Sequence, residues 1–361
     1  MEPFKNIYNT NEITRLADEI KAIDAAFSKE QFINSLLNDS WEQKELKERM
    51  RAISLSLGKF LPEYLQALEI LKQVHGKFNG LFHTVFPDFV EVYGLGYFEE
   101  SIEALKLFTQ NFSSEYAVRP FLIKYPQLIE TFQEWAQDEN EHVRRLASEG
   151  CRPRLPWGQA LPEYKQDPSK VLEVLELLKD DPSRYVQKSV ANNLNDISKD
   201  NPEIVKGVFQ KWYGISKNRD WIVKHAARTL LKAGDKDVLK LFGYSAEGIE
   251  ISNFTLDQSV HLNELLNFSF KIFSKKALGK LRIEYKLGLL RQKGKRNYKV
   301  FKISERDINT QEITINKAHH FKEVTTRKYY DGVQTLTIVV NGKEFATKEF
   351  QLLIDVAVKK I

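Results

Sequence analysis

Three stretches of one pattern decide the fold of this chain: DENEHVRRLASEG at residues 138–150, DPSRYVQKSVANNL at 181–194 and RDWIVKHAARTLL at 219–231. Each begins with polar residues, reaches a valine and continues with small residues and leucine at helical spacing. The three valines are 43 and 37 residues apart, a period typical of paired-helix repeats of the HEAT type. Because each such repeat buries its apolar stripe against its neighbours, the pattern predicts an α-solenoid.

The chain divides into two regions that differ in the period of their hydrophobic residues. Helical spacing extends over residues 1–243, with Pro, Gly and Asn between the helical stretches. From residue 245 onward, β-branched and aromatic residues cluster in about seven short runs, which is typical of an immunoglobulin-like β-sandwich. We therefore predict an α-solenoid of HEAT-like repeats at 1–243, followed by an immunoglobulin-like β-sandwich at 245–361. The hairpin signals within the sandwich are Asp331-Gly332 and Asn341-Gly342.

The composition is that of a folded globular protein, with 42% hydrophobic and 29% charged residues among 361. Cys151 is the single cysteine, so no disulfide forms within the chain and a reducing compartment is favoured. The sequence shows no signal peptide and no apolar run approaching about 18 residues, so we expect a cytoplasmic protein without a membrane partner. The seven histidines, among them His319 and His320, show no ligand spacing with cysteine or aspartate, so neither a metal nor a cofactor is expected.

The positive charge is concentrated in the second region. Residues 245–361 contain 16 Lys and 5 Arg against 9 Glu and 4 Asp, a net charge of +8 in a chain whose total is +5. Such a concentration favours a polyanionic partner. The sequence RQKGKR at 291–296 places four cations at a predicted hairpin tip, where they either contact phosphates or keep an edge strand from aggregating. Of these, Lys293, Lys295 and Arg296 are the expected contacts.

Cations also recur in the helical repeats. Two residues after each repeat valine come Arg145, Lys188 and His225. If the helices stack in parallel, these three side chains line one face of the solenoid, where they can contact a polyanion. The alternative is that they belong to ordinary solvated helix faces, which are often rich in Lys and Arg.

Carboxylates stand among these cations. Glu115 precedes Arg119 by one turn, Glu149 follows Arg145 by one turn, and Asp196 ends a string of asparagines. Polar residues on the inner side of a repeat helix make poor core and indicate a wet cleft. Taken singly, each acid is more typical of a helix surface residue that pairs with a neighbouring Arg or Lys.

The segments that carry these acids resemble the AlkC branch of the AlkC/AlkD DNA glycosylases, bacterial enzymes that remove alkylated bases. The resemblance rests on FSSEYAVRPFL at 112–122, HVRRLASEGCRPRLPWG at 142–158 and VQKSVANNLNDISKDNPE at 186–203. It implies a base-excision-repair hydrolase that cleaves the N-glycosidic bond of cationic bases, such as 3-methyladenine and 3-methylcytosine, in double-stranded DNA. A cationic base leaves readily, so the enzyme has to stabilise positive charge on the sugar and deliver water, and carboxylates near the sugar do both.

The protein is expected to act as a monomer. The resemblance also assigns roles to individual residues. The acids Glu115, Glu149 and Asp196 are the expected catalytic residues. Together with the repeat cations and the basic hairpin, the expected DNA-binding residues are Arg145, Arg152, Trp157, Lys188, Asn192, His225, Lys293, Lys295 and Arg296.

Two other functions fit the same architecture. A non-catalytic HEAT-repeat protein that binds bent or branched DNA would share the repeats and the basic charge, but it gains nothing from acids in its groove. A scaffold for protein partners is disfavoured by the concentrated positive charge. For Trp157, in a loop stiffened by Pro153 and Pro156, contact with DNA and a role as a core anchor for the loop remain open.

Overall fold

The structure is a computed structural model that describes residues 3–324 and 327–354. The side chain of Lys293, one of the expected DNA-binding residues, lies outside the described part. The chain forms two compact units, Met1–Ala226 and Ala227–Ile361. No helix in the described part is long and apolar enough to cross a membrane.

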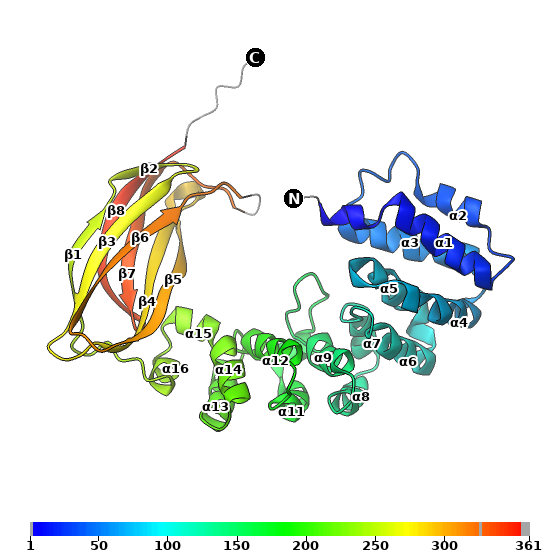
Figure 1. Ribbon diagram of the computed structural model, residues 1–361, viewed down its shortest axis with the longest axis horizontal. Coiled ribbons are helices and arrows are strands. Elements are labelled where there is room, and N and C mark those ends of the chain that lie inside the picture. The colour runs from blue at the N-terminus through cyan, green and yellow to red at the C-terminus, as the bar shows by residue number, and fades with distance from the viewer. Residues whose placement is uncertain (1–2, 325–326, 355–361) are drawn as a thin grey trace, which may run out of the picture. The chain divides into compact units, whose positions relative to one another are not determined.

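The first unit is helical throughout, which confirms the prediction for this region. In Figure 1 its helices follow one another in a curved row from α1 to α14. Its elements, with 3₁₀ helices marked η, are η1 (Phe4–Ile7), α1 (Thr10–Ile23), α2 (Lys29–Leu36), α3 (Leu46–Phe60), α4 (Tyr64–Val74), η2 (His75–Lys77), η3 (Gly80–Thr84), α5 (Val85–Tyr93), η4 (Gly94–Gly96), α6 (Phe98–Phe108), α7 (Val118–Lys124), α8 (Leu128–Trp135), α9 (Glu141–Gly150), α10 (Pro162–Gln166), α11 (Ser169–Leu178), α12 (Arg184–Ile197), α13 (Pro202–Trp212) and α14 (Lys217–Ala226).

The three repeat segments correspond to α9, α12 and α14, and each of these helices packs against the next. Their valines, Val143, Val186 and Val223, are fully buried, and burial of one such side chain contributes about 1.5–3 kcal/mol. The third segment differs from the expectation, because its helix stops at Ala226 and a new helix starts at Arg228. The successive packing supports a repeat arrangement, and its assignment to the HEAT class stays a prediction.

Helix α9 approaches α7 and α8 closely at its carboxyl end. A Cβ atom added at Gly150 would lie 2.9 Å from Val118 Cγ1 and 3.0 Å from Phe132 Cε2. Only glycine therefore fits at this position without movement of its neighbours. This packing fixes the end of α9, where Glu149 and the following loop begin.

The second unit begins with two short helices and continues as two β-sheets. Strands β1, β3 and β6 form one sheet in the order β1-β3-β6, and the other sheet has the order β2-β8-β7-β4-β5. All described strand pairs are antiparallel except β2 with β8. The elements are α15 (Arg228–Ala233), α16 (Lys236–Leu241), β1 (Glu250–Leu256), β2 (Ser259–His261), β3 (Leu265–Phe273), β4 (Gly279–Leu290), η5 (Gln292–Gly294), β5 (Arg296–Ile308), β6 (Glu312–His320), β7 (Gly332–Val340) and β8 (Lys343–Leu353).

The core of the second unit comes from both sheets, as the alternating sequence pattern predicts. Phe270 on β3 and Leu336 on β7 are buried in one hydrophobic cluster. The turn Asn341-Gly342 joins β7 to β8 as expected. Asp331-Gly332 does not form a hairpin turn, because β6 ends at His320 and Gly332 is the first residue of β7.

The boundary between the units lies earlier than the predicted limit at 243. Helices α15 and α16 pack on the β7–β8 turn, where a Cβ atom at Gly234 would lie 3.1 Å from the carbonyl oxygen of Gly342. Asn341 Nδ2 also donates to the Ser245 carbonyl at 2.6 Å. The two helices therefore belong to the sandwich unit, a long-range contact that helical periodicity does not reveal.

Candidate active site

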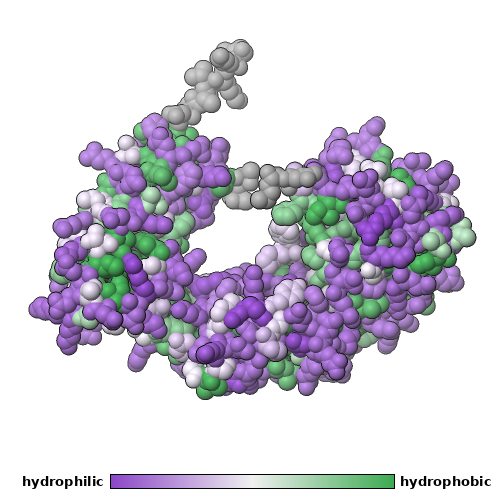
Figure 2. Space-filling model, viewed as in Figure 1, coloured by the Kyte–Doolittle hydropathy of each residue, from purple (hydrophilic) through white to green (hydrophobic). Residues whose placement is uncertain are grey.

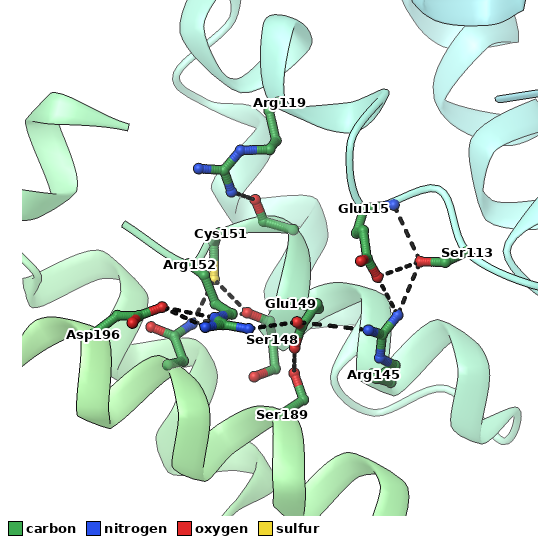
Figure 3. Close-up of polar contacts among 12 residues, drawn as sticks. Ser113, Glu115, Arg119, Arg145, Ser148, Glu149, Cys151, Arg152, Ser189 and Asp196 are labelled. Atoms are coloured by element: carbon green, nitrogen blue, oxygen red, sulfur yellow. Dashed lines mark hydrogen bonds and ion pairs between the residues drawn. The ribbon is translucent and has the colours of Figure 1, made fainter. Parts of the chain in front are cut away.

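The three predicted acids come together in the first unit. Glu115 lies in the turn between α6 and α7, whereas Glu149 and Asp196 lie in the last turns of α9 and α12. Two arginines join them into a row of alternating charge, shown in Figure 3. We call these five residues the charge row; in order they are Glu115, Arg145, Glu149, Arg152 and Asp196.

Arg152 forms the tightest connections in the charge row. Its Nη1 donates to Glu149 Oε1 at 2.6 Å, and its Nε donates to Asp196 Oδ2 at 2.8 Å. Arg145 Nη1 donates to Glu115 Oε2, and its Nη2 lies 3.6 Å from Glu149 Oε1. Each guanidinium therefore lies between two carboxylates, the planar geometry for which Arg is suited and Lys is not.

Hydroxyl and ammonium groups donate further hydrogen bonds to the acids. Ser113 Oγ donates to Glu115 Oε2 and Ser189 Oγ donates to Glu149 Oε2, each at 2.5 Å. Lys199 Nζ donates to Asp196 Oδ1 at 2.8 Å. Both oxygens of Glu149 and Asp196 thus have donors, whereas the donors to Glu115 in the described part all hold Oε2.

Burial makes these contacts energetically important. Glu149 and Asp196 are 5% and 2% exposed, and Arg152 is 6% exposed. Breaking a buried ion pair by removing one partner costs about 3–5 kcal/mol, because the remaining charge is left without compensation. Burial lowers the pKa of Arg152, but Glu149 and Asp196 outweigh burial and the pKa is raised. The guanidinium therefore stays charged and holds the acids in place.

Arg145 and Arg152 are placed differently from the sequence expectation. Both were expected to face DNA, but their guanidinium groups bind the carboxylates of the charge row. Arg145 also lies over the ring of Tyr185, 4.9 Å from its centroid. The spacing of Arg145 and Glu149 by one helical turn places both on one face of α9, so the two side chains meet.

Glu115 and Arg145 line a cleft in the first unit. Figure 2 shows a hydrophobic patch on the inner side of the N-terminal helices, on a face that is otherwise mostly hydrophilic. The cleft is lined by Tyr8, Leu46, Lys47, Met50, Leu81, Thr84, Phe112, Ser113, Glu115, Tyr116, Arg145, Trp157 and Tyr185. An acid at the edge of an aromatic-lined cleft is suited to a ligand that carries positive charge.

Trp157 lies at the rim of this cleft and is 70% exposed. Its φ of 64° is in the left-handed region, which is strained for a large side chain. Lys47 Nζ donates to the Trp157 carbonyl and also lies 4.7 Å from the Tyr116 ring centroid. The interpretation of Trp157 as a core anchor is therefore wrong, and its contact with DNA stays a prediction.

The remaining predicted residues lie at several places. On α12, Lys188 is exposed and Asn192 is half-buried, and His225 on α14 stacks on Trp221 with ring centroids 5.0 Å apart. In the second unit, Lys295 is exposed, and Arg296 is half-buried and donates to the Gly288 carbonyl at 3.2 Å. Their contact with DNA also stays a prediction.

Sequence reasoning missed the serines that hold the acids. Aligning the repeats on their valines places Ser189 of α12 opposite Leu146 of α9. A hydroxyl where the neighbouring repeat has a buried leucine is a signal that could have identified Ser189. The buried Asn193 also joins the two helices, because its Nδ2 donates to the Ser148 carbonyl on α9 at 2.8 Å.

Within the described residues, no group of three or more His, Cys, Asp or Glu side chains could hold a metal ion.

Comparison with known proteins places this site in a family. Residues 8–230 match the family model described as DNA alkylation repair enzyme, and residues 250–354 match the C-terminal Ig-like domain described for protein YhaZ. The chain is 46% identical to the uncharacterized protein YhaZ of Bacillus subtilis (strain 168), over 98% of this chain and 100% of that protein.

A solved structure matches this chain over nearly its full length. It is that of the Pseudomonas fluorescens alkylpurine DNA glycosylase AlkC, bound to DNA containing an abasic site analog. The TM-score is 0.93 at 35% sequence identity, with 98% of this chain and 100% of that chain covered. The chain therefore belongs to the DNA alkylation repair enzyme family and has an AlkC-like fold.

Proposed function

We propose that the protein is a monofunctional DNA glycosylase that removes cationic alkylated bases, such as 3-methyladenine and 3-methylcytosine, from double-stranded DNA. The observation that carries the proposal is the charge row, in which two arginines hold three carboxylates beside a cleft. The AlkC structure supports it, since that protein is an alkylpurine DNA glycosylase and matches this chain over nearly its full length.

The reaction needs little acid catalysis. The C1′–N bond breaks and its electron pair moves to the base, which neutralises the positive charge that alkylation placed there. Positive charge develops on the sugar, and water then adds to C1′ and loses a proton. Fixed carboxylates lower the energy of this state because they need no reorganisation as the charge appears.

The three acids have different positions in this scheme. Glu115 borders the cleft, and its Oε1 faces no donor in the described part, so it is placed to orient water or contact the sugar. Glu149 and Asp196 are saturated by donors and stabilise the cation through space. Hydrogen bonds from Arg152 hold both carboxylates in place, so their orientation does not depend on solvent.

Binding of the duplex is assigned to side chains outside the charge row. Lys188 on α12 and Trp157 at the cleft rim are available on the first unit. The basic hairpin tip of the second unit, with Lys295 and Arg296, supplies further phosphate contacts and can hold the duplex as a clamp. Such contacts offset the cost of a bent duplex, which is on the order of a few kcal/mol.

The decisive experiment incubates the protein with methylated duplex DNA and measures free 3-methyladenine and 3-methylcytosine by chromatography and mass spectrometry. Release by the unsubstituted protein is expected, with a single-turnover rate at least about 100-fold lower for Glu115→Gln at nearly unchanged DNA affinity. Glu130→Gln is the matched control, because Glu130 is an exposed acid on α8. Tight binding to duplex without release of any base would instead indicate a non-catalytic binder of bent DNA.

A further inference from the structure

Arg119 is a fully buried cation that lies beside the charge row without belonging to it. It is on α7 and is 0% exposed. Its Nη1 donates to the Gly150 carbonyl at 2.8 Å, and its Nε donates to the Gln159 carbonyl at 2.5 Å. Figure 3 shows the side chain directed toward the end of α9, next to the loop that carries Arg152.

These two hydrogen bonds join both ends of one loop. Gly150 is the last residue of α9, and Gln159 is nine residues further along the chain. Between them lie Arg152, which bridges two acids of the charge row, and Trp157, which borders the cleft. One guanidinium on α7 therefore fixes the loop that supplies both side chains.

The hydrogen-bond geometry requires the guanidinium specifically. Two carbonyl oxygens must accept from two nitrogens of a rigid plane, which the single ammonium of lysine does not supply. The arrangement is also costly, because Arg119 Nη2 is buried without a hydrogen-bond partner in the described part. Burial lowers the pKa of Arg119 to about 10, so the group still carries its charge at neutral pH.

We propose that Arg119 is a positioning residue for base excision: by closing the 150–159 loop, it places Arg152 between Glu149 and Asp196. The proposal rests on the glycosylase function proposed above. In the described part, Arg119 forms no hydrogen bond or ion pair with the acids and does not line the cleft, so its two hydrogen bonds act on the site through the loop that carries Arg152. A displacement of Arg152 by a fraction of an ångström misaligns two carboxylates with the sugar, and misplacements of this kind cost large factors in rate.

A double-mutant cycle separates this role from a general contribution to folding. Single-turnover excision is measured for Arg119→Met, Arg152→Lys and the double variant, with each rate normalised to the fraction that binds duplex with an abasic site analog. Arg119→Met is expected to lower the rate about tenfold or more when Arg152 is present, and less than about threefold in the Arg152→Lys background. Arg119→Lys, which keeps the charge but not the planar fork, is expected to resemble Arg119→Met.

Arg49 provides the matched control. It is also a buried arginine of the first unit, 2% exposed, and donates to Glu42 Oε2 at 2.9 Å. Arg49→Met is expected to lower the melting temperature without changing the normalised excision rate.

Equal losses for Arg119→Met in both backgrounds, or a fully active Arg119→Lys, would overturn the positioning role. No base release by the unsubstituted protein would overturn the proposed function itself, and Arg119 would then have no reaction to serve.

Discussion

Replacement of Arg152 by methionine tests whether the charge row is a single interdependent cluster. Methionine keeps the apolar stem of the side chain but removes the donors to Glu149 and Asp196. Two buried carboxylates then lose their shared cation. The variant should fold less stably at neutral pH and should also excise bases more slowly, because the same carboxylates stabilise the sugar cation.

The size of the stability loss follows from the contacts that remain. Loss of one partner from a buried ion pair costs about 3–5 kcal/mol. Glu149 keeps the hydroxyl of Ser189 and the guanidinium of Arg145, and Asp196 keeps the ammonium of Lys199. We therefore expect a loss near the lower limit, about 3 kcal/mol, which corresponds to a fall in melting temperature of about 6–12 °C for a unit of this size.

Tryptophan fluorescence during urea unfolding measures this loss in the helical unit alone. All five tryptophans of the chain, Trp41, Trp135, Trp157, Trp212 and Trp221, lie before residue 227 and therefore within the first unit. The tryptophan signal therefore reports on the unit in which all five side chains lie. The midpoint and slope of the transition then give the free energy of unfolding of the helical unit.

Two further variants make the result decisive. Asp196→Asn in the Arg152→Met background removes a buried charge whose remaining cation is Lys199, so the double variant should be about 1 kcal/mol more stable than Arg152→Met alone. Arg154→Met is the control, because Arg154 lies on the same loop but its pair with Asp200 is partly exposed, and exposed pairs contribute at most about 1 kcal/mol. A loss for Arg152→Met no larger than for Arg154→Met, with no recovery in the double variant, would refute the interdependent cluster.

Four other outcomes are expected. Burial raises the pKa of Asp88 to about 6, above its value in the unfolded chain. The contribution of this group to the free energy of unfolding is therefore complete below about pH 4 and is lost as the pH rises through 6. Asp88→Asn has no such loss, so in urea titrations its free energy of unfolding should rise relative to that of the parent by up to about 3 kcal/mol between pH 4.5 and 7.5. Lys188→Ala should reduce the salt dependence of duplex binding by about one unit of log–log slope in fluorescence anisotropy, and an unchanged slope would exclude a phosphate contact. A chain that ends at Ala226 should show a sharper thermal transition by circular dichroism than one that also includes α15 and α16, because these two helices pack on the absent sandwich. Lys295→Glu combined with Arg296→Glu should weaken duplex binding and lower excision at subsaturating DNA, whereas excision at the parent rate in moderate salt would exclude the clamp.

The sequence by itself determined the two regions and the acids of the site. Helical and strand periods are local properties, so the valines of the repeats indicated the buried faces of α9, α12 and α14 before any contact was known. The three acids were identified because carboxylates among arginines are unusual on the inner side of repeat helices. The turn at Asn341-Gly342 was also predictable, because its backbone conformation depends on the two residues themselves.

The tertiary structure alone decided which charges pair across long sequence distances. Arg152 is separated from Asp196 by 44 residues and Arg145 from Glu115 by 30, and no local pattern specifies which acid a long arginine side chain will reach. The sequence therefore suggested that the arginines face DNA, whereas the packing of α9 against α12 turns Arg152 onto the acids. The same reason applies to α15 and α16, whose helical period says nothing of the sandwich they join. Periodicity determines which face of an element is buried, but the partner across the interface is determined only when the elements pack together.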